Sequence, residues 1–252
     1  MIIGQIRANG HYTPCEHCPL PHCKALRAFN SDELAFVKQF KIDEMRVESG
    51  VSFLRQGAGS EHLYTVLQGW AFRYKMLDDG RRQILNYALP ADLIGLQGSL
   101  MGEMEHSVEA LTELTLCVFP RSKLLDLYSR FPSLAFDLTW LCAREERFGD
   151  ESLVSLGRRT ALERTAYMLL HLFTRAEEVG MTRNGTIQFP FTQQHMADTL
   201  GMSLVHTNKT LKRLSATQAV RWKDRYFQML DRAKLAELAG GEAAAHPPRP
   251  FI

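Results

Sequence analysis

Residues 192–214 read Thr-Gln-Gln-His-Met-Ala-Asp-Thr-Leu-Gly-Met-Ser-Leu-Val-His-Thr-Asn-Lys-Thr-Leu-Lys-Arg-Leu, a pattern that predicts two short helices joined by a glycine turn. Thr192 and Ser203 are suitable N-caps for these helices, because their hydroxyl groups can accept hydrogen bonds from the first backbone amides. Gly201 can adopt the left-handed conformation that ends the first helix. The turn, the caps and the spacing together indicate a helix-turn-helix.

The second predicted helix has two chemically different faces. At steps of three and four, its packing face carries Leu204, Thr207, Leu211 and Leu214, and its opposite face carries Val205, Asn208, Lys209 and Lys212. An asparagine amide suits adenine, a lysine ammonium suits guanine or a phosphate, and valine methyl groups suit the thymine methyl. The outward face therefore predicts contacts in the major groove of double-stranded DNA. The alternative is a helical hairpin with a solvated basic face.

The predicted DNA interface extends beyond this one helix. We expect the DNA-contacting residues to be Thr192, Gln194, Ser203, Val205, His206, Asn208, Lys209 and Lys212. The formal net charge of +2 does not by itself indicate a nucleic-acid partner. Basic residues nevertheless gather in this region, where they can neutralise phosphates: Lys209, Lys212, Arg213, Arg221, Lys223 and Arg225.

The composition limits the class of protein. A chain of 252 residues with 45% hydrophobic content is long enough for two ordinary domains. No apolar run reaches the roughly 18 residues that span a bilayer, and the first seven residues lack the apolar core of a signal peptide. We therefore expect a cytoplasmic protein with no membrane partner. Five cysteines are an odd set for a disulfide framework, so a reducing compartment favours metal binding or redox chemistry.

The rest of the chain divides into segments with different patterns. An irregular, proline-punctuated arm precedes a short helix that Ser31 is expected to cap, with Leu34, Val37 and Phe40 facing inward. From about residue 52 to 120, β-branched and aromatic runs broken by turn signals predict an antiparallel roll or barrel. Its clearest strands are residues 62–67, 70–77 and 82–89.

A long helix is expected from Pro132 to about Leu156, with Gly157 as a hinge. It precedes a helix at 161–178, a strand at 187–189, the helix-turn-helix and a hairpin wing at 221–227. The fold class is therefore α+β. We assign a cysteine-rich arm to residues 1–23, a β-roll sensor domain to 24–130, a dimerisation helix to 131–157, a winged helix-turn-helix to 158–239 and a flexible tail to 240–252.

A heptad pattern in the long helix predicts a dimer seam. The residues that alternate at steps of four and three are Leu134, Leu138, Leu141, Glu145, Phe148, Ser152 and Ser155. Only the first half of this stripe is strongly apolar, so association through it is expected to be conditional. The alternative is that the stripe packs against the roll.

The order of arm, roll, long helix and winged helix-turn-helix resembles the catabolite-activator and Fnr superfamily of bacterial transcription regulators. The resemblance covers nearly the whole chain and is carried by Gly57, Leu67–Gly69, Asp78–Gly80, Pro90–Gly95, Ala161–Arg164 and Thr192–Leu214. It implies a cyclic-nucleotide-binding-like jelly roll, a homodimer that binds two DNA half-sites, and contact with RNA polymerase. Val205 and Lys209 stand where these regulators usually have Glu and Arg, so the resemblance does not supply the operator sequence.

Cys15, Cys18 and Cys23 place three thiols within nine residues. The prolines among them keep the loop irregular and its amides available, and thiolates are the ligands of iron–sulfur clusters. The resemblance to oxygen-sensing Fnr proteins implies a [4Fe–4S] cluster with Cys117 as the fourth ligand. The interval between Cys18 and Cys23 is four residues, slightly shorter than in the Fnr pattern.

Other inputs remain open at this point. Zinc accepts the same thiolates and could recruit His11, His17 or His22, and a thiol–disulfide switch needs only two cysteines. Cys142 lies among apolar residues of the long helix and is expected to be a small core residue.

The sequence argues against a cyclic nucleotide in the roll. Gly95 is followed by Leu96-Gln97 where nucleotide-binding relatives have Glu, and Glu105-His106-Ser107 replaces their Arg-Ser or Arg-Thr pair. A carboxylate there would repel phosphate. A cupin-like enzyme is a further alternative, because cupins are also double-sheet barrels, but His62 and His106 lack paired histidines and no catalytic motif is present. We therefore expect a redox-sensing regulator and not an enzyme.

Overall fold

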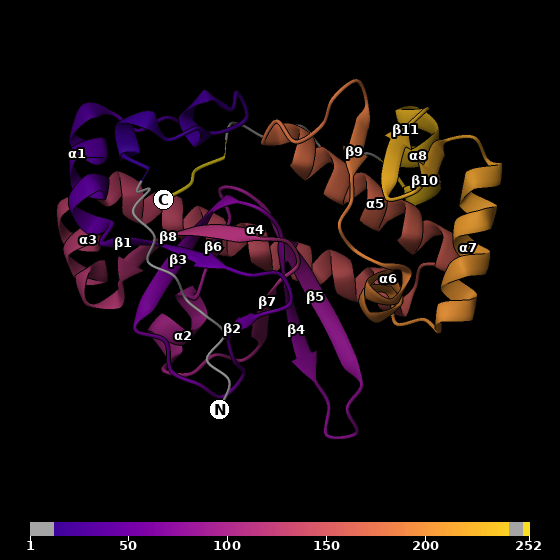
Figure 1. Cartoon of the computed structure of the whole chain (residues 1–252), viewed down its shortest axis with the longest axis horizontal. Helices are drawn as coiled ribbons and strands as arrows, with labels where there is room; N and C mark the ends of the chain where they lie inside the picture. The colour runs from indigo at the N-terminus through magenta and orange to yellow at the C-terminus, as the bar shows by residue number, and fades with distance from the viewer. Residues whose placement is uncertain (1–12, 242–248) are drawn as a thin grey trace. The chain divides into compact units, whose positions relative to one another are not determined.

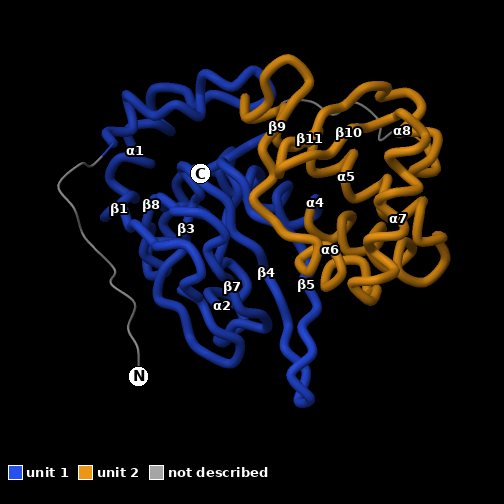
Figure 2. Tube along the Cα trace, turned by 45° about the vertical axis from the view of Figure 1, so that its right-hand side comes forward, with its two compact units in different colours: residues 1–144, 248–252 blue, residues 145–247 orange. Residues whose placement is uncertain are grey.

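The computed structural model describes residues 13–241 and 249–252. They form two compact units: residues up to Arg144 together with the last four residues, and residues from Glu145 onward (Figure 2). Figure 1 gives the element labels used below. No helix in the described part of the chain is long and apolar enough to cross a membrane.

Unit 1 contains two four-stranded sheets whose strand pairs are all antiparallel. Their orders are β1-β8-β3-β6 and β2-β7-β4-β5. The strands are β1 (Asp43–Val47), β2 (Ser52–Leu54), β3 (His62–Gln68), β4 (Ala71–Met76), β5 (Arg82–Ala88), β6 (Leu93–Ile94), β7 (Ser107–Ala110) and β8 (Leu114–Pro120). Val66, Val108 and Leu116 are fully buried in the core of this roll. The prediction of an antiparallel roll is confirmed.

Glycine turns fix where the strands reverse. Gly69, between β3 and β4, has φ 95°, and a Cβ added there would lie 2.3 Å from the Glu113 carbonyl oxygen. Only glycine fits so close to another backbone at that dihedral angle. Gly80 has φ 81° and closes the β4–β5 hairpin by donating to the Leu77 carbonyl.

The remaining elements of this unit are helices, of which only α4 is long. They are η1 (Cys15–His17), η2 (Leu20–His22), α1 (Ser31–Phe40), α2 (Leu96–Met101), η3 (Arg121–Lys123) and α3 (Leu124–Arg130), and α4 (Pro132–Gly157) continues into the second unit. We expected Ser31 to cap α1, but the cap is the residue before it. Asn30 caps the helix, because its side chain accepts from the amides of Asp32 and Glu33 while Glu33 accepts from the Asn30 amide.

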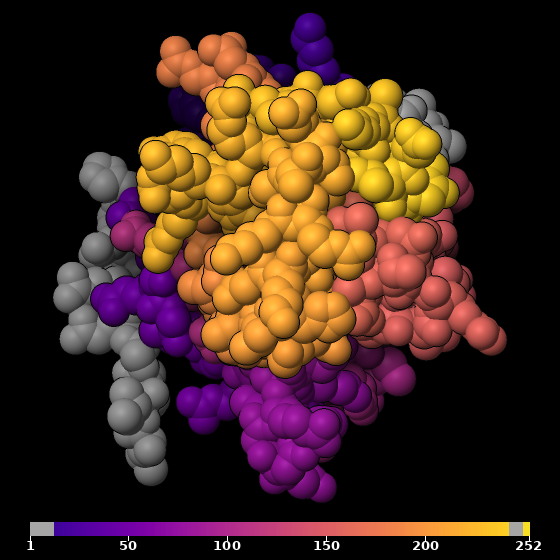
Figure 3. All heavy atoms as spheres, turned by 90° about the vertical axis from the view of Figure 1, so that its right-hand side faces the viewer, coloured from indigo at the N-terminus to yellow at the C-terminus, as the bar shows by residue number. Residues whose placement is uncertain are grey.

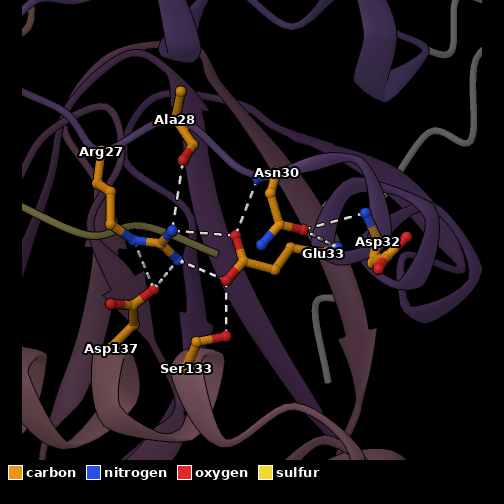
Figure 4. A network of polar contacts seen from close by, with 7 residues as sticks. All are labelled: Arg27, Ala28, Asn30, Asp32, Glu33, Ser133 and Asp137. Atoms are coloured by element: carbon orange, nitrogen blue, oxygen red, sulfur yellow. Dashed lines mark hydrogen bonds and ion pairs between the residues drawn. The ribbon is translucent and has the colours of Figure 1, made fainter.

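An ionic network connects the segment before α1 to the first turns of α4 (Figure 4). The Arg27 guanidinium pairs with Glu33 at 3.0 Å and also with Asp137, and the Ser133 hydroxyl donates to Glu33 at 2.6 Å. Burial alone raises the pKa of the Glu33 carboxyl, but hydrogen bonds from Arg27, Ser133 and the Asn30 amide together lower it. The network holds the chain that follows the cysteine loop against α4.

The apolar half of the predicted heptad stripe of α4 is buried within its own chain. Leu134, Leu138 and Leu141 are buried, and the Phe148 ring stacks on His171 with centroids 4.7 Å apart. These three leucines therefore do not face a second chain, contrary to our expectation. Cys142 is exposed, so its assignment to the core is also wrong.

Unit 2 is a winged helical fold. Its elements are α5 (Ala161–Glu178), β9 (Thr186–Gln188), α6 (Gln193–Leu200), α7 (Leu204–Ala216), β10 (Val220–Lys223), β11 (Tyr226–Met229) and α8 (Arg232–Ala239). The sheet order is β10-β11-β9. An aromatic group packs on the sheet, with Phe189 contacting Phe191, Trp222 and Phe227 at centroid separations of 4.6, 6.0 and 5.1 Å, and Phe227 connects it to Phe173 of α5 at 5.7 Å. The predicted order of helices, strand and wing is confirmed.

The assignment of a flexible tail to residues 240–252 is wrong for its end. Arg249, Phe251 and Ile252 are buried in unit 1. Composition did not reveal this, because the contacts that bury these residues come from distant parts of the sequence. Residues 242–248 of the predicted tail and residues 1–12 of the predicted arm, including His11, lie outside the described part of the chain.

Candidate nucleic-acid interface and cysteine site

The first helix of the helix-turn-helix begins as predicted. The Thr192 hydroxyl accepts from the His195 amide at 3.2 Å, and His195 Nδ1 accepts from the Thr192 amide at 3.1 Å. This reciprocal arrangement is a capping box in which histidine takes the place that glutamate or glutamine usually occupies. Sequence reasoning identified Thr192 and missed His195, because histidine is not among the usual partners.

The turn between α6 and α7 also has the predicted geometry. Gly201 has φ 60° and ψ 40°, the left-handed conformation, and its amide donates to the Ala197 carbonyl. The Ser203 hydroxyl accepts from the His206 amide at 3.2 Å and starts α7. The two helices are thereby held at a fixed angle by local hydrogen bonds.

The two faces of α7 differ in burial. Thr207, Thr210 and Leu214 are buried, whereas Val205 is 66% exposed, and Lys209 and Lys212 are also exposed. Leu204, assigned to the packing face, is 41% exposed. Figure 3 views the side of the molecule on which the α7 segment, drawn in orange, lies uncovered.

Asn208 differs from its neighbours on this face. Its side chain is only half-exposed, and its Oδ1 atom is buried without a hydrogen-bond partner among the described residues. It lines a cavity of about 630 Å³ between α7 and the wing, to which Lys212, Trp222 and Arg225 also contribute. Asn208 is therefore less available to a base edge than Lys209.

The other predicted contact residues lie at the start of each helix. Thr192, Gln194, Ser203 and His206 are all exposed. The Gln194 amide donates to Asp198 Oδ1 at 2.7 Å, which holds that side chain along its own helix. The amino ends of both helices therefore present polar groups and backbone amides, which suit phosphate oxygens.

The wing adds basic groups beside α7. Asp224 and Arg225 form its turn with φ 51° and 69°, the left-handed values that a tight hairpin requires. Arg221, Lys223 and Arg225 are exposed. They place positive charge on the exposed surface of the wing, a charge of the kind that neutralises phosphates.

The predicted cluster ligands gather in one region of unit 1. Cys15 and Cys23 belong to or directly follow the short helices η1 and η2, Cys18 lies between them, and Cys117 lies on β8. All five cysteines of the chain are thiols. The Thr13 amide, two residues before Cys15, donates to Glu44, and Glu44 is the cross-strand neighbour of Cys117, so the start of the cysteine loop lies against this part of the sheet.

A buried lysine lies beside these thiols. The Lys41 ammonium donates to the Thr13 carbonyl at 3.0 Å and pairs with Glu44 at 3.3 Å. Burial raises the pKa of the Cys117 thiol to about 12, and Lys41 acts in the opposite direction. Burial likewise raises the pKa of Cys15, again opposed by Lys41. Sequence reasoning missed Lys41, because a lysine and a glutamate three residues apart usually lie on the surface.

The cysteine site has the donors for a metal or cluster without a preformed arrangement. Residues 13–241 and 249–252 contain no group of three or more His, Cys, Asp and Glu side chains already placed around a metal position. The chemistry of the donor set fits a thiolate-bound group, since four thiols are available and Lys41 can offset the negative charge of thiolates. The residues that could hold such a group are Cys15, Cys18, Cys23 and Cys117.

The positions at which nucleotide-binding relatives hold a phosphate carry different residues in this roll. Gly95 has φ 93°, and a Cβ there would lie 3.0 Å from the His62 carbonyl oxygen. The Glu105 carboxylate is directed to Lys75 at 3.1 Å, and the Ser107 hydroxyl accepts from the Gln56 amide at 3.1 Å. Glu105 and Ser107 thus each have a partner elsewhere in the roll.

An antiparallel roll, a long helix and a winged helix-turn-helix with an exposed basic face define a DNA-binding transcription regulator. Comparison with protein-family models gives the same class: residues 44–131 match the cyclic nucleotide-binding domain, and residues 163–238 match the Crp-like helix-turn-helix domain. The chain belongs to the Crp/Fnr family of transcription regulators. The predicted family and fold class are confirmed.

Several characterised regulators are similar over almost the whole chain. The nitrogen fixation regulation protein FixK of Bradyrhizobium diazoefficiens is 29% identical over 239 residues, which cover 94% of this chain and 98% of the relative. The transcriptional activator FnrL of Cereibacter sphaeroides is 28% identical, over 91% and 93% of the two chains. The transcriptional activator Anr of Pseudomonas protegens is 26% identical, over 90% and 93%.

Solved structures are similar as well. FixK2 from Bradyrhizobium japonicum matches with a TM-score of 0.71 and 27% identity, over 80% of this chain and 98% of that chain. A CRP-family transcriptional regulator from Thermus thermophilus matches with a TM-score of 0.64 and 21% identity, over 80% and 99%. At that identity the second match supports the fold alone.

Proposed function

We propose that this regulator is a cytoplasmic homodimer whose sequence-specific DNA binding responds to oxygen through a [4Fe–4S] cluster held by Cys15, Cys18, Cys23 and Cys117. The observation that supports the proposal is the contact of Thr13, at the start of the cysteine loop, with Glu44, the cross-strand neighbour of Cys117, beside the buried Lys41. The similarity to FnrL and Anr, both transcriptional activators, supports regulation of this kind.

Base reading is proposed for the exposed face of α7. Lys209 and Val205 are the residues best placed for base edges, and Thr192, Gln194 and Ser203 for phosphates. His206, Asn208 and Lys212 complete the proposed interface, with Asn208 needing a side-chain rotation to free its Oδ1 atom. Contact between the dimer and RNA polymerase on the DNA is part of the same proposal.

The dimer is proposed to form through an exposed stripe of α4. Phe136 and Leu153 are 68% and 73% exposed, which is unusual for large apolar side chains. Thr139, Ala143, Glu146 and Asp150 connect them at steps of three and four, and all are exposed. The acidic residues in the stripe limit its strength, so association can respond to a signal.

A bound cluster supplies oxygen-labile redox chemistry at this position. The protein's own contribution is to hold the arm on the roll. Lys41 and Glu44 bind the backbone of Thr13, and Arg27 binds Asp137 of α4, so the order of the arm can affect the start of the proposed dimer helix.

The test is anaerobic purification followed by iron and sulfide analysis, an absorption spectrum, and selection of bound sequences from random DNA. We expect iron and sulfide in the anaerobic protein, and an operator with two half-sites about one helical turn apart. If the analysis finds zinc and no sulfide, the cysteines bind zinc, the alternative metal, and not an iron–sulfur cluster. If the protein contains no metal, whether purified with or without air, the cluster is rejected. If the selection recovers no paired half-sites, the proposed mode of DNA binding is rejected.

A further inference from the structure

Residues 249–252, Arg-Pro-Phe-Ile, are held in unit 1 as tightly as a core segment. The chain leaves this unit after Arg144 and returns to it only at its end. Arg249, Phe251 and Ile252 are 5%, 3% and 4% exposed. We name these four residues the C-terminal clasp.

The clasp adds a short strand to the segment that follows the cysteine loop. The Arg249 amide donates to the Ala25 carbonyl at 2.8 Å, and the Arg27 amide donates to the Arg249 carbonyl at 2.8 Å. Leu26 and Arg249 thus form a parallel bridge. Extended peptides commonly bind to sheet edges in this way, because backbone hydrogen bonds supply affinity and side-chain pockets supply specificity.

Two side chains of the clasp have matching partners. The Arg249 guanidinium donates to Asp92 Oδ1 at 2.8 Å and to the Pro90 carbonyl at 2.9 Å, and both charged side chains are more than nine-tenths buried. The Phe251 ring lies 4.8 Å from that of Phe29. An arginine and an aromatic residue two positions apart are therefore the side chains through which the clasp contacts unit 1.

The groove is continuous with the cysteine site. Cys117 pairs with Glu44 on one neighbouring strand and with Thr65 on the other, so the three side chains form one row across the sheet. Glu44 accepts from the Thr13 amide, and the Thr65 hydroxyl donates to the Ile252 carbonyl. The arm and the clasp therefore border Cys117 from opposite sides.

The groove also connects to the cysteine loop and to α4. The Leu26 amide donates to the Cys23 carbonyl at 2.9 Å. Asp92 accepts from Arg144 of α4 at 3.1 Å in addition to Arg249, so the clasp shares its acidic partner with the long helix.

We infer that Ala25–Phe29, Thr65, Pro90 and Asp92 form a peptide-binding groove, that the clasp is its resident ligand, and that its occupancy shields Cys117. When the clasp is bound, unit 1 holds the chain both before and after the DNA-binding unit. When the clasp is released, the two units are connected through α4 alone. The inference concerns peptide contacts of the cluster-free chain and does not depend on the proposed cofactor.

The first test measures thiol reactivity in metal-free full-length protein. The double variant Arg249→Gln/Phe251→Ala removes both recognised side chains, and alkylation of each cysteine is followed by mass spectrometry. We expect Cys117 to react at least about tenfold faster than in the unchanged protein, because local opening limits the labelling of a buried group. Cys142 is exposed and serves as the internal reference.

Arg232→Gln is the matched control, because it removes an arginine whose pairing with Glu177 is on the surface of the other unit. It should leave Cys117 as slow as in the unchanged protein. Equal Cys117 rates in the double variant and the unchanged protein would overturn the inference.

The second test supplies the ligand in trans. A fluorescent peptide with the sequence Pro-Pro-Arg-Pro-Phe-Ile should bind the double variant saturably, and a scrambled peptide should not. The unchanged protein should bind the peptide at least about tenfold more weakly, because its own clasp competes at a high effective concentration. Absence of saturable binding, or equal affinity for both proteins, would contradict a peptide groove.

Hydrogen exchange on the unchanged protein tests the inference even if the double variant does not fold. The amides of Arg27 and Arg249 donate to each other's segments, so both should be protected and should become exchangeable together. Rapid exchange at Arg249 beside slow exchange in β8 would show that the clasp is not bound.

Discussion

Lys209 is the residue of α7 whose exposure and charge best suit a base edge. We expect Lys209→Ala to weaken operator binding by about 1–3 kcal/mol and to relax the preference at particular base pairs, because a lysine on guanine discriminates among bases. Competition binding against a panel of single-base operator changes measures both effects. Lys234→Ala, an exposed lysine of α8, is the matched control and should leave the preference unchanged.

A uniform loss across the panel would mean that Lys209 contacts phosphate, and the reading face would then have to be placed elsewhere on α7. Asn208 illustrates why the prediction centres on lysine. The sequence assigned both residues to the same face, but packing against the wing buries the Asn208 Oδ1 atom.

Individual residues that act at a distance were the least predictable from sequence. Lys41 is 5% exposed and binds Thr13 and Glu44, and none of the three is marked by an unusual local pattern. Its contact with Thr13 joins residues 28 positions apart in the chain, which is tertiary packing. The cysteines were singled out in the sequence because three of them in a proline-rich loop are rare, whereas a charged pair at the spacing of Lys41 and Glu44 is common.

Among the elements, the turn of the helix-turn-helix has the clearest cost of substitution. Gly201→Ala should reduce the free energy of unfolding by about 1–2 kcal/mol, because Gly201 has φ 60° and a side chain there is strained. Chemical denaturation measures the change. Gly149→Ala is the control of opposite sign, since Gly149 lies within α4 with no atom near its added Cβ, and it should stabilise by about 0.5–1 kcal/mol.

Equal effects of the two glycine substitutions would contradict a conformational role for Gly201. This turn was predicted from sequence because its determinants are local: Thr192 and Ser203 accept from amides three residues later, and the Gly201 amide donates to a carbonyl four residues earlier. The strands of the roll were predictable for a similar reason, since turn signals at Gln68-Gly69 and Asp78–Gly80 delimit them.

The orientation of α4 was not predictable in this way. The helix carries an apolar stripe through Leu134 and Leu138 and a mixed stripe that includes Phe136 and Leu153, and the heptad pattern alone favoured the first. Only the tertiary fold decides which stripe is buried. The second stripe is the one left exposed and therefore the one proposed for the dimer.

At the scale of the whole molecule, the exposed stripe predicts how the dimer can be broken. Phe136→Glu should raise the dimer dissociation constant by at least about tenfold, because burial of a phenylalanine contributes about 1.5–3 kcal/mol and about 1.4 kcal/mol is a factor of ten. Sedimentation over a concentration series measures it. Leu125→Glu changes an apolar residue of α3 that is 80% exposed, and should have no effect if the seam is on α4. Equal weakening by both substitutions would place the interface elsewhere.

The last prediction concerns the response of the complete regulator to oxygen. Cys117→Ser removes the one proposed ligand that comes from the roll, whereas Cys142→Ser changes an exposed thiol of α4. We expect Cys117→Ser to lose iron and to bind the operator equally with and without air. Cys142→Ser should keep its iron and bind more tightly without air. The reason is that Cys117 is the proposed ligand that lies on the sheet, on β8, and the segment after the cysteine loop is connected to α4 through Arg27 and Asp137.

Iron content, sedimentation and operator binding are compared for both variants and the unchanged protein, each prepared anaerobically and then exposed to air. Unfolding curves accompany them, because Cys117 is buried and a serine hydroxyl there can destabilise the roll. If folded Cys117→Ser protein retains iron and its response to air, Cys117 is not a ligand. If the unchanged protein binds its operator equally in both conditions, oxygen is not the signal, and the assignment of α7 to DNA reading is unaffected.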